Sequence, residues 1–464
     1  MRAFRLVSNA SSLFCPRAEW KKQIKSKAQQ PEPRGAGTDM LIRSPFDIPS
    51  NHHEWGLQEV GARGQSSRGN LLAGVPRSIV LMVIVLSINN FAFGYLMVYI
   101  SAYLPEIGVP ATTVGLMLGM EGLTMAVMAI PFGIISDRKG RKRLLITGSL
   151  GPFPMFLAFA LTTDAAVMIA ASALGGLFEG VYLATVNALI ADQTAPEDRN
   201  VAFTLSFILG GAGSALGMAF PFFLPELGIL LGIEKAALHA GLLYIFALIS
   251  LATPPALWSI LRGVKESVRG SPGAWRGKGL GILFKFSGIN SIIGLGAGFI
   301  IPLIPTWLYL KFAVPDSFSG PILAIANATI GLGAAFSPKL ASKLGSVKAI
   351  VFTQGLSLAF MVALAFIGDF FTAAFLYVIR TGLMNMASPL MDAFLMGIVH
   401  PEQRGFASSL NSVIWRIPNS ITTIIGGAIL ASGNFELPFL VAGGFYVVGI
   451  SLFYLVFKDV KQVG

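Results

Sequence analysis

Five side chains that carry charge at neutral pH lie inside long apolar stretches of the sequence: Glu121, Glu179, Arg380, Asp392 and Arg416. A carboxylate can carry a proton or bind a cation, and a guanidinium can bind an anion. Each such charge costs about 2.5–3.5 kcal/mol at the centre of a bilayer, so five charges facing lipid would cost about 12–18 kcal/mol. These side chains must therefore face a wet cavity or one another.

Polar residues continue the pattern at helical spacing around these charges. The stripes are Ser409, Ser412, Arg416, Asn419 and Thr423, then Thr381, Asn385, Ser388 and Asp392, and a softer one of Met117, Glu121, Thr124 and Met128. Such stripes can also hold helices together through hydrogen bonds. For the charged members we favour a pathway for substrate or protons. The predicted pathway residues are Asn90, Glu121, Glu179, Asn290, Arg380, Asn385, Asp392 and Arg416.

The elements that must position these residues are membrane-spanning helices. The composition is 54% hydrophobic with 12% charged residues, whereas soluble domains carry about 25% charged residues. From residue 78 onward we expect twelve apolar stretches, each close to the roughly 20 residues that cross a bilayer. They span 78–102, 112–136, 143–163, 166–190, 201–225, 237–261, 281–310, 317–338, 347–368, 371–399, 405–432 and 435–457. The predicted fold class is an all-α membrane protein.

A short basic turn joins the second and third of these stretches. It reads GIISDRKGRKR over 133–143, with five basic residues and the carboxylate of Asp137. A charged turn this short between two apolar spans must lie at a membrane surface. The spacing G-x-x-x-D-R-x-G-R-K closely resembles the loop between helices 2 and 3 of the major facilitator superfamily of transporters.

An internal repeat agrees with this resemblance. A shift of 205 residues places Arg138-Lys139-Gly140 on Lys343-Leu344-Gly345, and Pro196-Glu197-Asp198-Arg199 on Pro401-Glu402-Gln403-Arg404. Two loops that share one offset indicate two parallel copies of a six-helix unit, as in transporters built from repeats. We predict a disordered basic cytoplasmic tail over 1–77, bundles over 78–261 and 281–457, a cytoplasmic loop over 262–280 and a tail over 458–464.

The resemblance implies a conformational latch at this turn. Gly133 would let helices 2 and 11 approach, and Asp137 would face the amino-terminal end of helix 11. Arg138 and Arg141 would complete the charge relay, and Gly140 would make the turn. A partly buried carboxylate at a helix N-terminus gains up to about 2 kcal/mol, and this gain would favour the outward-facing state. In the second copy Ser342 replaces Asp137, so the latch should be asymmetric.

Charge counting predicts the orientation. With the amino terminus inside, the inner loops and C-terminal tail carry seventeen Lys and Arg residues, against two, Lys235 and Lys311, in the outer loops. We therefore expect a multi-pass protein, in the cell membrane, with both termini in the cytoplasm. The arginine- and serine-containing start of 1–77 also fits an organelle transit peptide or an upstream start with Met40 as an alternative.

Several function classes are disfavoured. Cys15 is the single cysteine and none of the four histidines sits in mid-span, so we expect no metal and no cofactor. The net charge of +11 fits basic cytoplasmic loops, and we expect no nucleic-acid partner. A membrane enzyme would need a nucleophile, base or ligand set that the isolated carboxylates do not supply. A receptor on a transporter fold would bind a ligand without moving it across the membrane.

The expected partners are a small-molecule substrate and the lipid bilayer, and we expect a monomer.

The predicted function is secondary active transport of a small solute by alternating access. No G-x-x-x-x-G-K-[ST] motif appears, so ATP is not the energy source within this chain. Drug/proton antiporters of the superfamily usually show R-x-x-Q-G in helix 4, where this chain has Gly176-Leu177-Phe178-Glu179-Gly180. Glu121 or Glu179 could still carry a proton. We lean to efflux of hydrophobic or amphipathic compounds, and the alternative is a uniporter or symporter of an organic anion or metabolite.

Overall fold

The computed structural model describes residues 74–195, 197–266, 280–399 and 404–460, and the regular secondary structure in these ranges is helical. Most of the predicted tail 1–77, residues 267–279 of the predicted loop and residues 461–464 lie outside the described residues. The first half contains α3 Arg77–Val98, η2 Tyr99–Tyr103, α4 Leu104–Glu106, α5 Ala111–Lys139, α6 Arg141–Gly148, α7 Pro152–Leu161, α8 Ala165–Gln193, α9 Arg199–Ala219, η3 Phe220–Phe223, α10 Leu224–Leu231 and α11 Lys235–Leu261. The second contains α12 Leu280–Gly298, η4 Ile301–Leu303, α13 Ile304–Phe312, α14 Asp316–Leu344, α15 Ser346–Phe366, α16 Phe370–Ile398, α17 Arg404–Ala431 and α18 Leu437–Phe457.

The predicted helical membrane fold is confirmed. Among the described residues, eleven helical segments are long and apolar enough to cross a membrane, and α14, with 29 residues, matches α5 in length. The predicted third stretch is a pair of helices, because the chain turns at Ser149–Gly151 ahead of Pro152. Proline lacks the N–H that would continue the first helix, so it begins the second one. The basic turn is shorter than predicted, because Asp137 and Lys139 remain in α5.

The two halves repeat with the offset seen in the sequence. Helices α5 and α14 begin and end 205 residues apart, and so do α8 and α16. The caps repeat as well: Asp164 Oδ1 accepts from the Val167 N–H at 3.0 Å, and Asp369 Oδ1 accepts from the Thr372 N–H at 2.9 Å. A side-chain oxygen at this position satisfies an N–H that the first helical turn leaves free. The same local signal thus starts the fourth long helix of each half.

The turns after α5 and α14 also match. Gly140 has φ +98° and Gly345 has φ +80°, values that side chains other than glycine rarely adopt. Each turn joins its two helices through this single residue. This geometry explains why the glycine of the basic turn recurs at the shifted position.

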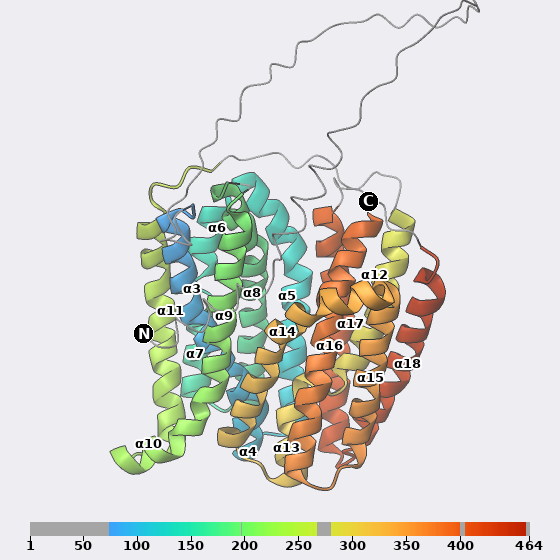
Figure 1. The fold of residues 1–464 in the computed structure, drawn as a ribbon. Helices are drawn as coiled ribbons and strands as arrows, with labels where there is room; N and C mark the ends of the chain where they lie inside the picture. Colours follow the sequence, from blue (N-terminus) through green and yellow to red (C-terminus); the bar gives the residue numbers. More distant parts are fainter. Residues whose placement is uncertain (1–73, 196, 267–279, 400–403, 461–464) are drawn as a thin grey trace, which may run out of the picture. The chain divides into compact units, whose positions relative to one another are not determined.

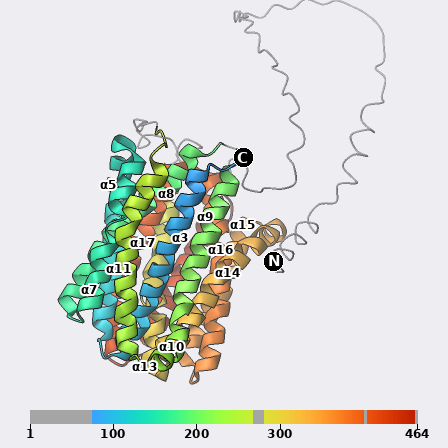
Figure 2. The same ribbon diagram turned by 90° about the vertical axis from the view of Figure 1, so that its left-hand side faces the viewer.

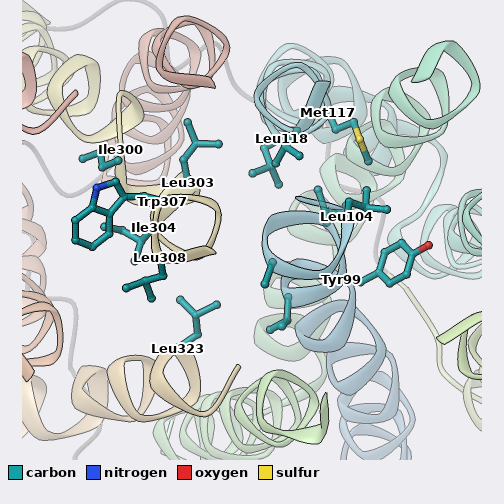
Figure 3. Close-up of a cluster of buried hydrophobic side chains, with 14 of the residues drawn as sticks. Tyr99, Leu104, Met117, Leu118, Ile300, Leu303, Ile304, Trp307, Leu308 and Leu323 are labelled. Carbon is teal, nitrogen blue, oxygen red and sulfur yellow. The ribbon is translucent and has the colours of Figure 1, made fainter. Parts of the chain in front are cut away.

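The hydrophobic cores differ at the two ends of the helices. We name the ends after Glu106, the last residue of α4, and Asp137 in the last turns of α5. In Figure 1 α4 and α13 lie at the lower end and α6 at the upper end. At the Glu106 end one cluster contains side chains of both halves, among them Tyr99, Leu104, Leu303 and Trp307 (Figure 3). Away from this end, each half has its own separate cluster, around Leu145 and Leu257 in one and around Phe286 and Phe453 in the other.

Two pairs of helices join the halves. Helix α5 packs on α17, and α9 packs beside α14 (Figure 2). The first pair is in close contact at Gly115 and Gly427, where a Cβ on Gly115 would lie 2.9 Å from the Gly427 Cα. Small residues allow such close contact between membrane helices. By contrast, a Cβ added to Gly133, nearer the Asp137 end of α5, would meet no atom within 4 Å.

Candidate functional site

Two neighbouring cavities lie between the helices of the two halves. The first, of about 440 Å³, is lined mainly by α3, α5 and α8, and we call it the N-terminal lobe. The second, of about 470 Å³, is lined mainly by α12, α16 and α17, and we call it the C-terminal lobe. Pro302, Arg416 and Asn419 line both lobes. Arg416 therefore lies where the two lobes meet.

The structure brings all eight predicted pathway residues to these lobes. The N-terminal lobe contains Asn90, Glu121, Glu179 and Arg416, and the C-terminal lobe contains Asn290, Arg380, Asn385, Asp392 and Arg416. Helical spacing places the stripes of α16 and α17 along the lobes, except for Ser409, which lines neither lobe. Of the softer stripe on α5, Glu121 lines the N-terminal lobe, and Met117, Thr124 and Met128 do not. Their part in transport stays a prediction.

The N-terminal lobe has unbalanced charge. Glu121 is within electrostatic range of both Glu179 and Arg416. Among the described residues, neither carboxylate makes a hydrogen bond or an ion pair within contact distance, and both side chains are half-buried. Two carboxylates thus share one guanidinium as their nearby positive charge. A proton or a cationic group bound in this lobe would restore the balance.

The C-terminal lobe is polar in a different way. Asn290 Nδ2 donates to Asn411 Oδ1 at 3.1 Å, and Asn385 Nδ2 reaches Thr329 Oγ1 at 3.5 Å. Each of these amides thus makes a hydrogen bond to a neighbouring helix and also lines the lobe. Asp392 is exposed, near the end of α16.

Apolar surface surrounds these polar groups. Phe93, Met97, Met125 and Phe178 line the N-terminal lobe, and Met384 and Trp415 line the C-terminal lobe. Methionine side chains adapt to ligands of different shape. Apolar walls with a few charged groups are typical of a site for an amphipathic molecule.

In the part of the chain that the structure describes, the ion pairs of the predicted latch lie within its own half. Asp137 Oδ1 lies 3.0 Å from Arg141 Nη2, and Arg141 also pairs with Asp192 of α8. Arg138 is exposed, and Gly140 forms the turn as expected. Among the described residues, no ion pair joins the two halves at the Asp137 end. A latch that closes in another state stays a prediction.

A charged network at the Glu106 end was missed by the sequence analysis. Lys235 Nζ lies 2.6 Å from Glu106 Oε1 and 2.6 Å from Asp316 Oδ1, and His239 Nε2 lies 3.2 Å from Asp316 Oδ2. Glu106 Oε2 also accepts from the Asp316 backbone N–H at 3.2 Å. Asp316 belongs to the second half and the other three to the first, so this network joins the halves.

The aromatic residues around His239 complete this network. Its Nδ1 lies 2.5 Å from the Tyr95 hydroxyl, and its ring stacks on Tyr103 with centroids 3.6 Å apart. The only signal in the sequence was Lys235, which we counted as a loop charge. Partners 81 and 210 residues apart cannot be recognised without the fold.

Comparisons with known proteins agree with this architecture. The family model of the Major Facilitator Superfamily matches residues 81–286 and 286–463. The chain is 23% identical over 402 residues to Multidrug resistance protein 2 of Bacillus subtilis (strain 168), covering 82% of this chain and 96% of that protein. It is 21% identical over 378 residues to Quinolone resistance protein NorA of Staphylococcus aureus (strain COL), covering 79% and 94%.

A solved structure shares the fold. A bacterial homologue of the human lysosomal transporter Spinster, in an inward-facing and occupied conformation, superimposes with a TM-score of 0.64 at 16% identity. The similarity covers 82% of this chain and 96% of that structure. Helices, internal repeat and family model agree, and the chain belongs to the major facilitator superfamily of membrane transporters.

Proposed function

We propose that this transporter exports amphipathic compounds by alternating access in exchange for protons. The observation that carries the proposal is the contrast between the two ends. At the Glu106 end the halves share one core and a charged network, whereas elsewhere each half has its own core. The two lobes, whose charged side chains form no ion pair among the described residues, lie between the halves. This is the arrangement expected of a carrier closed on one side of its binding site.

The orientation is part of this proposal. The Asp137 end carries the basic turn, and the excess of Lys and Arg in loops at this end indicates the cytoplasm. The described conformation is then inward-facing, with both chain termini inside. We further propose that the bundles 78–261 and 281–457 move as the two units, in the cell membrane, as a monomer, and that the chain catalyses no chemical reaction.

The coupling follows from charge balance in the N-terminal lobe. Protons that bind Glu121 and Glu179 at the outer face would compete with a compound that binds there from the inner face. Such competition exchanges the two across the membrane. The relatives named for multidrug and quinolone resistance support export as the direction.

The test uses the full chain in proteoliposomes that contain a pH-sensitive dye. A fluoroquinolone and other amphipathic compounds are added under an imposed pH gradient, and proton movement is followed. We expect compound-dependent proton flux in the wild type and none in the Glu121→Gln, Glu179→Gln double variant. Retained coupling in the folded double variant would contradict the proposal. The variant Glu197→Gln, outside the lobes, is the matched control.

A second candidate, uniport or symport of an organic anion, is favoured by one observation. The C-terminal lobe contains two guanidinium groups, of Arg380 and Arg416, and a single carboxylate at its exposed end. Flux of an anion that is insensitive to Glu121 and Glu179 would support this function over exchange with protons.

A further inference from the structure

The C-terminal lobe contains a buried positive charge without a counter-ion. Arg380 of α16 is 3% exposed, and among the described residues its guanidinium forms no ion pair. Its Nη2 donates to the Tyr446 hydroxyl at 2.8 Å and lies 3.9 Å from the Met361 sulfur. Its Nε has no hydrogen-bond partner. Arg380 thus lines the C-terminal lobe with a guanidinium whose buried Nε–H has no partner.

The surroundings hold this group in place without neutralising it. The Tyr446 ring lies under the guanidinium, with the centroid 5.7 Å from Cζ, and Ser357 Oγ donates to the Arg380 carbonyl at 3.1 Å. Asp392 is twelve residues further along α16, or about 18 Å at 1.5 Å per residue. A buried charge that is fixed but unpaired is costly to the fold. A bound anion that neutralises this charge would recover part of that cost.

The internal repeat shows that this charge is specific to one half. Position 380 corresponds to Gly175 in the first half, and position 416 corresponds to Gly211. In the reverse direction, Glu121 and Glu179 correspond to Ala326 and Met384. The carboxylates of the N-terminal lobe and the guanidiniums of the C-terminal lobe therefore have no counterparts across the repeat. The paired lobes present opposite charge to one bound molecule.

We propose that Arg380 binds the anionic group of the transported compound, a carboxylate, sulfonate or phosphate. This assignment rests on the proposed transport function and names its substrate class. The guanidinium offers planar N–H donors that match such groups, and Met384 and Trp415 of the same lobe contact the apolar body. The compound extends past Arg416 toward the N-terminal lobe. A positively charged end, where present, reaches Glu121 and Glu179.

Binding to the purified full chain tests this assignment directly. The probes share one scaffold and differ in charge: 4-butylbenzoate, 4-butylbenzylammonium and the neutral 4-butylbenzyl alcohol. Ligand binding raises the melting temperature with ligand concentration. We expect 4-butylbenzoate to bind more tightly than the other two probes. Equal or tighter binding of the ammonium compound would overturn the proposal.

Variants locate the anion within the lobe. Arg380→Gln should weaken 4-butylbenzoate binding roughly tenfold or more, the usual effect of losing a charged hydrogen bond. Arg416→Gln should weaken it less, because the anion is held at Arg380. The opposite ranking of these two variants would place the anion at Arg416 and overturn the proposal.

A second pair of variants tests the same assignment if Arg380→Gln fails to fold. Met361→Glu places a carboxylate beside the guanidinium, at the position of a sulfur 3.9 Å from Nη2. This internal counter-ion should abolish 4-butylbenzoate binding, whereas Met361→Gln, of equal size and no charge, should retain it. Unchanged binding in Met361→Glu would contradict the assignment.

The result of these binding experiments can be distinguished from the result of the transport test of the proposed function. Anion binding is read in detergent and needs neither a membrane nor a pH gradient, whereas proton exchange is read in proteoliposomes. If 4-butylbenzoate binds selectively but no proton flux is seen, Arg380 stands as the anion site and the proposed exchange with protons is wrong. Proton flux with compounds that lack an anionic group, unaffected by Arg380→Gln, would retain the exchange and remove this inference.

Discussion

Asp316 Oδ1 lies 2.6 Å from Lys235 Nζ, and this contact joins the first turns of α14 and α11 from opposite halves. The Asp316 side chain is fully buried, whereas that of Lys235 remains 29% exposed. Glu106 contacts both residues, through Lys235 Nζ and the Asp316 backbone N–H. In the alternating-access cycle this network must break when the Glu106 end opens. It therefore sets part of the balance between the two states.

Loss of the Asp316 charge should favour opening of the Glu106 end. The Asp316→Asn variant removes the carboxylate that faces Lys235 and His239 from the second half, whereas the backbone N–H that donates to Glu106 remains. The expected cost to the closed state is about 1–3 kcal/mol. This is less than the roughly 3–5 kcal/mol of a fully buried pair, because Lys235 contacts solvent. Spin labels at Ile233 and Phe366, exposed residues near this end, in a Cys15→Ser background should report longer distances.

Two further variants make this measurement specific. The double variant Asp316→Asn, Lys235→Met should open the Glu106 end by less than the sum of the single effects, because both remove one interaction. Lys311→Met removes a pair with Glu436 inside the second half and should leave the distances unchanged. Additive effects, or an equal shift in Lys311→Met, would show that the network does not hold the halves together.

The sequence predicted the parts of this fold that depend on local pattern. The length of the apolar stretches identified the spans, and the shift of 205 residues identified the repeat. Both signals can be recognised from short runs of consecutive residues. The charges in mid-span indicated a cavity, because charged side chains such as Glu121 and Arg416 are too costly to place against lipid. The tertiary partners could not be predicted in this way. Asp316 lies just before the predicted stretch 317–338, where nothing in the sequence pointed to Lys235, and nothing near Arg380 in the sequence indicated Tyr446.

The cap of α16 should depend on pH. The Asp369 carboxylate accepts from the Thr372 backbone N–H, and this bond lowers the pKa of the group below its usual range. A lowered pKa stabilises the fold above the unfolded-state pKa of about 3.9, and the gain disappears as the pH falls through the folded pKa. Asp369→Ala should therefore lower the melting temperature at neutral pH and match the wild type more closely in acid.

Asn at the same position is the control for this cap. Its amide oxygen can accept the same bond without titrating, so the difference in melting temperature between Asp369→Asn and Asp369→Ala should stay nearly constant over that pH range. A gap between wild type and Asp369→Ala that does not narrow in acid would show that the carboxylate charge contributes nothing to the cap.

The two repeat glycines should differ in their tolerance of a side chain. Gly140 and Gly345 have φ +98° and +80° with ψ 135° and 152°, a region that costs other residues about 1–3 kcal/mol. A Cβ on Gly140 would also lie 2.7 Å from Glu266 Oε2, whereas one on Gly345 would meet no atom within 4 Å. Glu266 Oε1 accepts from the Lys142 N–H at 2.5 Å, so moving this side chain would break a second interaction.

Thermal unfolding of the two alanine variants checks this difference. We expect both Gly140→Ala and Gly345→Ala to be less stable than the wild type, and Gly140→Ala to be the less stable of the two. Adding Glu266→Ala should remove the extra loss in Gly140→Ala. If Gly345→Ala were the less stable variant, contacts beyond the described turns would have to dominate over backbone strain.

The latch should act in the state opposite to the described one. Asp137 contacts Arg141 of its own half here, so its predicted role at the end of helix 11 requires closure of the Asp137 end. Asp137→Asn would remove up to about 2 kcal/mol from that closed state. It would cost the described state less, because the partly exposed pair with Arg141 is worth about 0–1 kcal/mol. Spin labels at Arg143 and Lys343, both exposed, should then report a larger population of the longer distance.

Ser342→Ala, 205 residues further along the chain, should have no effect, because that position carries no charge. A shift toward the shorter distance in Asp137→Asn would show that Asp137 holds the Asp137 end open and would overturn the latch.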